Sequence, residues 1–516
     1  MRRFLVVLAL SGLGASALLA GVATARTPAR RAPLVRPLIS DWQYLGNSAT
    51  PPTQAACNAV GRRCFNPTSM ANSYNYANLH SLGNEGQGKT IAIIDSFGSS
   101  TIRQDLGTFD TAFDVPHLCG ETGPSDPSAN CSSSSGPRFD IVCYQGCPSP
   151  TPPPPSNGTG QEDHNLWDLE VALDVEWAHA TAPLANIMLV TTPTAETLGV
   201  QGLQQMMNAE QYVVDNHAAD VITQSFGAGE GSFHNGLSTL NQLRQAFVDA
   251  QANHVTVFAS SGDGGTTNPY KEPVKNPGTI PYPSVIWPAS DPLVTSVGGT
   301  SLCTDAATGT MVDSVDPPAA CQNNPGVREI AWLFAATHVG TGGGYSIYFP
   351  RPSYQGTLPP GSTYTGTTPG APGPNQNMRG VPDVAYQADS HTGALVYMTE
   401  PANTQSGPGC SGQASPCSTG WYVVGGTSAA SPQWAGLTAI ADQMAGRDLG
   451  FINPALYQIA DNSSQYATDF YDVTIGCNQT SSIPGYCAST GWDAVTGLGT
   501  PNAGNLIPDL IAATGP

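Results

Sequence analysis

The most constraining feature of the sequence is a glycine-rich segment at residues 425–436, which reads GGTSAASPQWAG. Apolar and β-branched residues at 421–424 precede it and predict a strand. Two glycines then allow a tight turn, and small residues at 429–432 open a segment, 434–444, that we expect to form a buried helix. A serine on a tight turn between a strand and a helix is a known way to position a nucleophilic hydroxyl. Ser428 is therefore the candidate nucleophile, and amides of the adjoining helix would favour negative charge beside it.

Other short apolar runs predict a parallel sheet. Helical patterns at 161–180, 200–216 and 237–253 separate these runs. This alternation predicts an α/β fold with a mostly parallel central sheet and helices on both of its faces. We interpret residues 121–160, which are rich in proline and serine, as a loop insertion, and residues 356–377 as loop-rich. The predicted strands lie at 90–95, 186–190, 221–225, 255–260 and 294–298.

The N-terminus has the pattern of an export signal. Two arginines, an apolar run at 4–22 and Ala-Thr-Ala at 23–25 predict a signal peptide at 1–25 and a secreted, extracellular protein. The apolar run is also long enough for a membrane anchor, but the small-residue ending favours cleavage. We expect an N-terminal extension at 26–70, basic and flexible up to residue 37, followed by one large catalytic domain at 71–516.

The twelve cysteines indicate disulfides that staple local loops, as expected for an exported chain. No CxxC pair suggests zinc, and the spacing does not determine the pairing. Near neighbours occur at 57/64, 303/321, 410/417 and 477/487, and cysteines 119, 131, 143 and 147 form a looser cluster.

Charge also limits the partners of this chain. It holds 38 acidic residues against 18 Lys and Arg, a formal net charge of −20, which argues against nucleic acid or an anionic membrane as partner. With few basic groups, little positive repulsion remains once the carboxylates are protonated, so we hypothesise an acid-tolerant surface. The acidic excess would equally serve solubility alone.

A nucleophilic serine needs a base, and no histidine here suits that role. None of the nine histidines has the glycine-flanked context of a catalytic base, and His164 and His179 flank a predicted helix as surface or packing residues. Asp95 ends a predicted strand as the aspartate of subtilisins does. Without a partner histidine, that resemblance is evidence about the fold only.

Three carboxylates are better candidates. Glu170 and Asp174 lie four residues apart, on one face of a predicted helix with apolar residues between them. Burial would make them share a proton, and such a pair can accept a proton from serine in acid, where histidine is already charged. The alternative is a solvated acidic helix face. Asp263, in Ser-Ser-Gly-Asp-Gly-Gly, could cap a helix or bind a cation, or, when protonated, donate to an oxyanion.

These segments resemble the sedolisin family, the serine-carboxyl peptidases with a subtilisin-like fold. The segment 425–436 is similar to the family's serine motif, and Glu170, Asp174 and Asp263 match its acid pair and its oxyanion aspartate. Residues 221–227 resemble the strand whose backbone pairs with substrate, which implies substrate contacts at Ser225 and Gly227. Further similar segments lie at 342–345, 349–355 and 380–384.

The resemblance implies a secreted endopeptidase that hydrolyses proteins or peptides at acidic pH. Ser428 would attack the scissile carbonyl, Glu170 would accept its proton and return it to the leaving amine, and Asp174 would hydrogen-bond to Glu170. Asp263 and the Ser428 amide would hold the oxyanion.

A structural calcium ion is also implied. Two aspartates on glycine-rich loops suit a hard cation, although turn-forming aspartates would explain the pattern alone. The segments 471–476 and 491–497 resemble the sedolisin calcium loop. The resemblance assigns side-chain ligands to Asp472 and Asp493, and carbonyl ligands to Val473, Ser489 and Gly491.

One departure from the family is the short stretch between the predicted signal and the domain, which cannot hold the family's long propeptide. The protein then folds without one, or an inhibitor resembling it acts in trans, or the start is truncated. We expect a monomer. Two other function classes fit less well: a glycosidase would leave Ser428 without a role, and a non-catalytic or weakly active calcium-binding relative would normally have lost one of the four catalytic residues.

Overall fold

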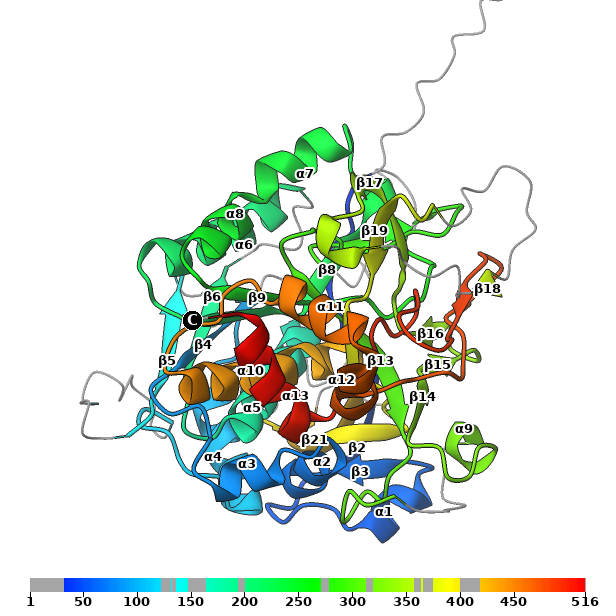
Figure 1. Ribbon diagram of the computed structural model, residues 1–516. Helices are drawn as coiled ribbons and strands as arrows, with labels where there is room; N and C mark the ends of the chain where they lie inside the picture. Colours follow the sequence, from blue (N-terminus) through cyan, green and yellow to red (C-terminus); the bar gives the residue numbers. More distant parts are fainter. Residues whose placement is uncertain are drawn as a thin grey trace, which may run out of the picture.

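An eight-stranded sheet forms the centre of the protein in the computed structural model (Figure 1). Its order is β14-β13-β9-β7-β4-β6-β5, with β20 also paired to β13. All neighbours are parallel except β13 and β14. The structure describes residues 32–121, 131, 136–146, 164–193, 200–270, 278–311, 319–356, 363–364, 375–399 and 418–515. The strands are β4 (Thr90–Ser96), β5 (Phe139–Cys143), β6 (Asn186–Thr192), β7 (Val221–Gln224), β9 (Thr256–Ser260), β13 (Thr295–Leu302), β14 (Glu329–Ala331) and β20 (Val384–Gln387).

The predicted mostly parallel α/β sheet is confirmed, and each of the five predicted strands is one of its members. The prediction of a loop throughout 121–160 is wrong where the chain is described. Residues 139–143 form β5, which pairs in parallel with β6 at the sheet edge. The short Phe-Asp-Ile-Val-Cys run forms a strand because β6 lies beside it. The Ser- and Pro-rich residues around it favour a loop, so the sequence alone does not indicate this strand.

Helices cover both faces of the sheet (Figure 1). Alternate side chains of β4 point to opposite faces: Ile91 and Ile93 join one core, and Ala92 and Ile94 join the other. The first core includes α5 (His164–Thr181) and α10 (Ser431–Ala445); the second includes α6 (Val200–Asp215), α7 (Leu237–Leu243) and α8 (Gln245–Ala252).

The predicted helix at 237–253 is two helices, and the break lies at Arg244. The Arg244 guanidinium donates two hydrogen bonds of 2.7 Å to the buried Asp291 carboxylate, an ion pair distant in sequence. A contact of this kind is not encoded in helical periodicity.

A second, four-stranded sheet contains the strand that directly precedes the turn with Ser428. Its order is β2 (Asp41–Gly46), β22 (Gly420–Gly425), β21 (Thr392–Met398) and β3 (Arg63–Phe65). The expected extension at 26–70, flexible up to residue 37, therefore needs correction. Residues 36–37 form β1, which pairs with β8 (Phe226–Gly229), and two strands of this sheet come from the segment 41–65. Their partners lie hundreds of residues away, so local sequence does not reveal the pairing.

The remaining elements complete the surface and the loops. The other helices are α1 (Gln54–Ala59), α2 (Pro67–Ser73), α3 (Ala77–Ser81), α4 (Ile102–Phe113), α9 (Ala319–Gln322), α11 (Asn453–Asp461), α12 (Ser463–Asp469) and α13 (Ala503–Ala513). The other strands are β10 (Pro269–Tyr270), β11 (Gly278–Thr279), β12 (Ile286–Trp287), β15 (Leu333–Phe334), β16 (Val339–Gly340), β17 (Gly344–Pro350), β18 (Thr363–Tyr364), β19 (Met378–Val381), β23 (Phe470–Tyr471), β24 (Tyr486–Cys487) and β25 (Thr500–Pro501).

Disulfides close local loops, as predicted. Three near-neighbour pairs are bonded, 57–64, 303–321 and 477–487, and Cys119 bonds to Cys131 from the looser cluster. Cys143 is also disulfide-bonded. The 410/417 pair and Cys147 lie outside the described residues.

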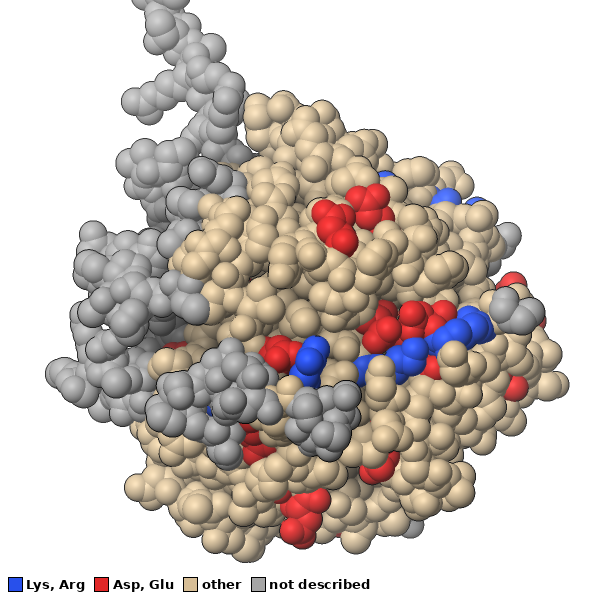
Figure 2. All heavy atoms as spheres, turned by 90° about the vertical axis from the view of Figure 1, so that its left-hand side faces the viewer, with Lys and Arg blue, Asp and Glu red and all other residues tan. Residues whose placement is uncertain are grey.

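Two surface properties bear on partners. Where the chain is described, it contains no helix with the length and apolarity needed to cross a bilayer. On the face drawn in Figure 2, most described atoms belong to uncharged residues. Several basic groups lie beside acidic ones in a band across the middle, further acidic groups lie above and below that band, and no broad basic area is seen.

Candidate active site

Ser428 lies where the sequence predicts it, in a short 3₁₀ turn (Thr427–Ala429) between β22 and α10. Its side chain is fully buried. The turn requires glycine before it, because Gly426 has φ = +133°, a conformation that residues with a side chain rarely adopt. The observed strand, turn and helix match the expected elements at 421–424 and 434–444 to within a few residues.

Glu170 approaches the nucleophile from α5. The Ser428 hydroxyl donates a hydrogen bond to Glu170 Oε1. Glu170 and Asp174 are both fully buried, because α5 is apolar on almost every side and packs between the sheet and α10. The predicted burial of the acid pair is therefore observed, and the solvated acidic face is excluded. No hydrogen bond joins the two carboxyls to each other.

A third acid, Asp95, faces this pair from the end of β4. Burial, then the charge of Asp174 and the charge of Asp95, raises the pKa of Glu170 well above its usual range. Burial and the charge of Asp95 do the same to the pKa of Asp174. Burial raises the pKa of Asp95 to about 8. Asp95 thus influences the pKa values of the acid pair. From the sequence, its position at the end of a strand was evidence about the fold only.

No histidine takes part in this arrangement among the described side chains. None of them forms a hydrogen bond or ion pair with Ser428, Glu170 or Asp174. His179, although on α5, is buried against Asp110 at 3.2 Å, which agrees with a packing role. The side chain of His164 lies outside the described part of the structure.

Asp263 lies on the other side of the nucleophile, in the loop after β9. Its Oδ1 accepts hydrogen bonds from the Thr427 amide and hydroxyl, both at 2.8 Å, while Oδ2 has no hydrogen-bond partner among the described residues. Burial raises its pKa to about 6, against hydrogen bonds from Thr427 and the charge of the buried Arg36 guanidinium, which lower it. Asp263 is therefore next to the residue that precedes Ser428, as an oxyanion ligand must be. No pattern in the sequence indicates a separate role for Thr427.

Ser225 and Gly227 lie along one edge of the site, at the junction of β7 and β8. Gly227 is opposite Arg36 in the antiparallel pairing of β1 with β8. The Ser225 carbonyl accepts a hydrogen bond of 2.9 Å from the Leu38 amide and lies 3.5 Å from the Ser428 hydroxyl oxygen. This edge therefore binds an extended backbone, and the chain's own N-terminal segment occupies it.

The sequence matches known peptidases over nearly its whole length. A profile of the subtilase family matches residues 160–454. The chain is 28% identical over 503 residues to kumamolisin from Bacillus sp. (strain MN-32), covering 95% of this chain and 73% of that protein. It is 29% identical over 456 residues to sedolisin from Pseudomonas sp. (strain 101), covering 88% and 62%. Human tripeptidyl-peptidase 1 is 27% identical over 375 residues, covering 68% of this chain and 53% of its own length.

The fold agrees with these matches. A solved structure of Pseudomonas sedolisin, a serine-carboxyl proteinase complexed with pseudo-iodotyrostatin, superposes with a TM-score of 0.59 at 26% identity, covering 87% of this chain and 98% of that one. The chain belongs to the sedolisin family. The chain thus spans between about half and three quarters of the length of these curated relatives. The comparisons support a serine-type peptidase with a subtilisin-like fold.

The residues that the sedolisin resemblance assigns to calcium come together in the structure. Asp472 Oδ2 accepts a hydrogen bond of 3.0 Å from the Gly491 amide, and Asp493 Oδ2 accepts one of 2.9 Å from the Ser489 amide. Asp472 Oδ1 is buried and has no hydrogen-bond partner among the described residues. The carbonyl oxygens of Val473, Ser489 and Gly491 accept no backbone hydrogen bond from described residues. Asp493 Oδ1 already accepts hydrogen bonds of 2.8 Å from the Val495 and Thr496 amides. Asp472 Oδ1 and the three carbonyl oxygens, which accept none from described residues, lie on two adjacent loops and fit a hard cation.

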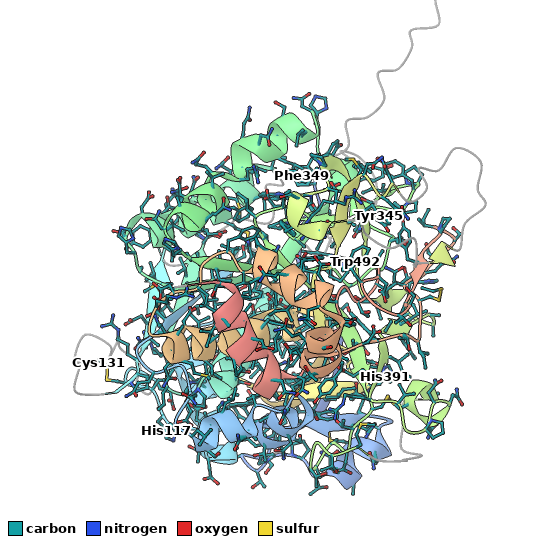
Figure 3. The ribbon with its side chains drawn as sticks, in the orientation of Figure 1. His117, Cys131, Tyr345, Phe349, His391 and Trp492 are labelled. Carbon is teal, nitrogen blue, oxygen red and sulfur yellow. A yellow bond between two sulfur atoms is a disulfide. The ribbon has the colours of Figure 1, made fainter. Side chains whose placement is uncertain are left out.

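A second cluster of metal-ligand types lies elsewhere. Ligand atoms of Asp110, His117 and Glu121 lie within 4.8 Å of one another. His117 and the neighbouring Cys131 lie at one side of the molecule, whereas Trp492, beside the predicted calcium loop, lies toward the other (Figure 3). His117 already hydrogen-bonds to Glu121, and His179 Nε2 lies 3.2 Å from the Asp110 carboxylate.

Proposed function

We propose that this protein is a serine-carboxyl endopeptidase that hydrolyses peptide bonds of proteins at acidic pH. The observation that carries this proposal is the hydrogen bond from the Ser428 hydroxyl to a buried carboxyl of Glu170. A carboxyl occupies the place that histidine takes in the Ser-His-Asp arrangement. The family assignment supports serine-type proteolysis, and the acidic surroundings of the serine support the carboxyl subtype.

Each residue of the site has a distinct role in the proposed reaction. Ser428 Oγ attacks the scissile carbonyl carbon while Glu170 accepts its proton and then passes it to the leaving amine. Burial, and then the charges of Asp174 and Asp95, raise the pKa of Glu170, so that ionised Glu170 is a stronger base toward the Ser428 hydroxyl. Asp174 and Asp95 therefore act through Glu170. The Ser428 amide and Asp263 stabilise the oxyanion, and the Ser225 and Gly227 backbone aligns the substrate.

The acidic pH range that we propose for activity follows from the protonation state of Asp263. It can donate to an oxyanion only when protonated, and its pKa is raised to about 6 by burial. Both hydrogen bonds from Thr427 go to Oδ1, which leaves Oδ2 as the oxygen that carries the proton. Activity should therefore decline as pH rises through about 6.

We also propose one structural calcium ion held by Asp472 and Asp493 side chains and by the carbonyls of Val473, Ser489 and Gly491. The ion would cross-link the two loops. It would take no part in the reaction at Ser428. The free oxygens on these loops support this assignment.

Secretion and the choice of partners are further proposals. The predicted signal at 1–25 and several disulfides support an extracellular location. The net charge of −20 supports protein or peptide substrates rather than nucleic acid or a membrane. We propose a monomer, with any propeptide-like inhibitor in trans as an additional control.

The test is hydrolysis of denatured casein between pH 3 and 7, with mass spectrometry of the products. We expect internal cleavage at acidic pH, and Ser428→Ala should lower kcat/KM by about 10³-fold or more. Ser431→Ala is the matched control, because Ser431 is a buried serine that hydrogen-bonds to Thr223, away from Glu170. Ser428→Ala with wild-type activity, or hydrolysis only above pH 7, would refute the proposal.

A further inference from the structure

Three side chains of metal-ligating types meet beside the C-terminal end of α4, on the side of the molecule where Figure 3 labels His117. Asp110 belongs to the last turn of α4, and His117 and Glu121 belong to the segment that follows it. One nitrogen of His117 and one carboxylate oxygen of each acid lie within 4.8 Å of one another. These residues have no role in the proposed reaction at Ser428, and they are separate from the calcium loops at 471–476 and 489–497.

The backbone after α4 folds these side chains back toward the helix. Asp114 ends α4 with φ = +55°, a left-handed conformation that turns the chain. The Leu118 amide donates to Glu121 Oε2 at 2.7 Å, and the Glu121 amide donates to the Leu118 carbonyl at 3.2 Å. The disulfide between Cys119 and Cys131 holds the same turn. Glu121 is therefore fixed with its side chain inward, only 1% exposed.

The state of Asp110 distinguishes this cluster from a pair of surface groups. Asp110 is 0% exposed, and neither of its carboxylate oxygens forms a hydrogen bond with a described residue. His179 Nε2, on α5, lies 3.2 Å from Asp110 Oδ2, but this nitrogen donates to the Pro116 carbonyl at 2.9 Å. Burying a carboxylate without hydrogen bonds is costly, and a bound cation removes that cost. Asp110 is therefore oriented into the cluster with acceptor positions to spare.

The effects of Asp110 on its neighbours show that negative charge accumulates here. Burial, and then the charge of Asp110, raises the pKa of Glu121 to about 7. Burial raises the pKa of Glu176 well above its usual range, against a hydrogen bond from the Tyr397 amide, and the charge of Asp110 adds to the increase. Burial lowers the pKa of His179, but the charge of Asp110 and contact with its carboxylate outweigh this and raise it. A divalent ion would neutralise the two adjacent acids, Asp110 and Glu121.

The donor set favours zinc over calcium. Calcium takes six or more oxygen ligands, whereas zinc takes four ligands and accepts an imidazole nitrogen together with carboxylates. Zinc bonds of about 2.0–2.2 Å place tetrahedral ligands about 3.4 Å apart, so small rotations of the three side chains suffice. His117 can rotate, because its side chain is 53% exposed. This exposure also gives the ion a path of entry and leaves room for water as a fourth ligand.

We propose that Asp110, His117 and Glu121 bind one Zn²⁺ ion. The ion replaces the proton of the hydrogen bond between His117 Nδ1 and Glu121 Oε1. His179 lies behind the Asp110 carboxylate and holds it in place, as outer partners of metal-bound carboxylates do. Zinc thus joins the end of α4 to the turn at 114–121 and, through His179, to α5. Its effect is on the stability of this region and not on the reaction at Ser428.

Calorimetric titration of zinc into the full-length Ser428→Ala protein at neutral pH tests the site. The protein is first freed of metal with a chelator and then saturated with calcium, so that Asp472 and Asp493 are not available to zinc. We expect one zinc ion per chain, and X-ray absorption at the zinc edge should show nitrogen and oxygen ligands at about 2.0–2.2 Å, with one imidazole. At a hundredfold excess over Kd, zinc should raise the Tm by about 3 °C.

A matched pair of histidine variants, made in the Ser428→Ala protein, tests the position of the ion. His117→Gln changes an exposed side chain, so the fold should remain, but it removes the nitrogen ligand. Loss of a ligand should cost at least as much as loss of an outer partner, so we expect zinc affinity to fall at least about 100-fold. His234→Gln makes the same change at another exposed histidine, outside the cluster, and should bind zinc with the parent affinity.

A second ligand variant, Glu121→Gln, should also weaken zinc binding and abolish the rise in Tm. Absence of zinc binding by the Ser428→Ala protein overturns the inference, as does unchanged affinity in His117→Gln. Equal losses in His117→Gln and His234→Gln would show that zinc binds surface histidines without a defined site, which overturns it as well. These measurements do not depend on catalysis, so they leave the peptidase proposal to its own test.

Discussion

Asp263 has two oxygens in different surroundings, and this difference is the residue-scale basis of the acid requirement that we propose. Thr427 donates twice to Oδ1, while Oδ2 lies unpaired on the side of Gly426 and the Leu38 carbonyl. The Leu38 carbonyl oxygen accepts a hydrogen bond of 3.2 Å from the Ser428 amide and so lies at the proposed oxyanion position. A protonated Oδ2 would complete the proposed oxyanion site with the Ser428 amide, and an ionised one would repel the developing charge.

Asp263→Asn separates hydrogen bonding from titration. The amide can still donate, but with altered strength and without a charge that changes with pH. We expect kcat/KM at pH 4 to fall about 10²-fold, and the loss of activity through pH 6 to become shallower, because burial sets the pKa of Asp263 to about 6. A pH–rate profile identical to wild type would show that Asp263 is not the titrating donor.

Gly426 limits the site sterically. In Gly426→Ala the new Cβ would come within 2.1 Å of the position of the Leu38 carbonyl oxygen at φ = +133°, so we expect kcat/KM to fall by at least about 10²-fold. Gly446→Ala is the control, since Gly446 has φ = +66° but no atom within 4 Å of its Cβ position. Equal activity in the two variants would show that crowding at the oxyanion site is unimportant.

At the scale of elements, α5 and β4 place three carboxyls where water cannot solvate their charges. Glu170 and Asp174 come from one helix turn, and Asp95 comes from the adjacent strand end. Burial raises the pKa of Asp95 to about 8 and raises the pKa of each of the other two. The folded protein therefore holds protons that the unfolded chain releases near pH 4.

Stability should consequently fall as pH rises. Between about pH 4 and pH 8 the folded state binds more protons than the unfolded state, so the free energy of unfolding decreases with pH. Melting scans of Ser428→Ala, which cannot digest itself, should give a higher Tm at pH 4 than at pH 8. Asp95→Asn in the same background should reduce this slope. A Tm that rises from pH 4 to pH 8 would contradict the expectation.

The two loops at 471–476 and 489–497 are the elements that calcium would join. At a hundredfold excess over Kd, a bound ion contributes about 2.7 kcal/mol, so chelation should lower the Tm by several degrees. Calorimetric titration of Ser428→Ala should show one site, and Asp472→Asn should weaken it. An unchanged Tm after chelation, with no heat of binding, would reject the site.

For the whole molecule, the features that could be predicted from the sequence are those that depend on short local patterns of residues. The buried strand with Ile91 and Ile93 and the turn before Ser428 follow from short apolar runs and glycine. The spacing of Glu170 and Asp174 predicts their common face, and both prove buried.

Features that depend on distant contacts could not be predicted in this way. The strand at 139–143 forms against β6, and the segment 36–46 forms against residues 226–227 and 421–425. The approach of Asp95 to Glu170 depends on how α5 packs on the sheet. The position of Leu38 at Ser428 depends on all of these contacts together.

The most direct measurement of how Ser428 is activated compares kcat/KM of wild type and Glu170→Gln from pH 3 to pH 7. Glu176→Gln is the control, because Glu176 is equally buried on α5 but hydrogen-bonds to the Tyr397 amide. We predict a loss of at least about 10³-fold at every pH for Glu170→Gln and near wild-type activity for Glu176→Gln. Wild-type rates in Glu170→Gln would contradict activation of Ser428 by Glu170.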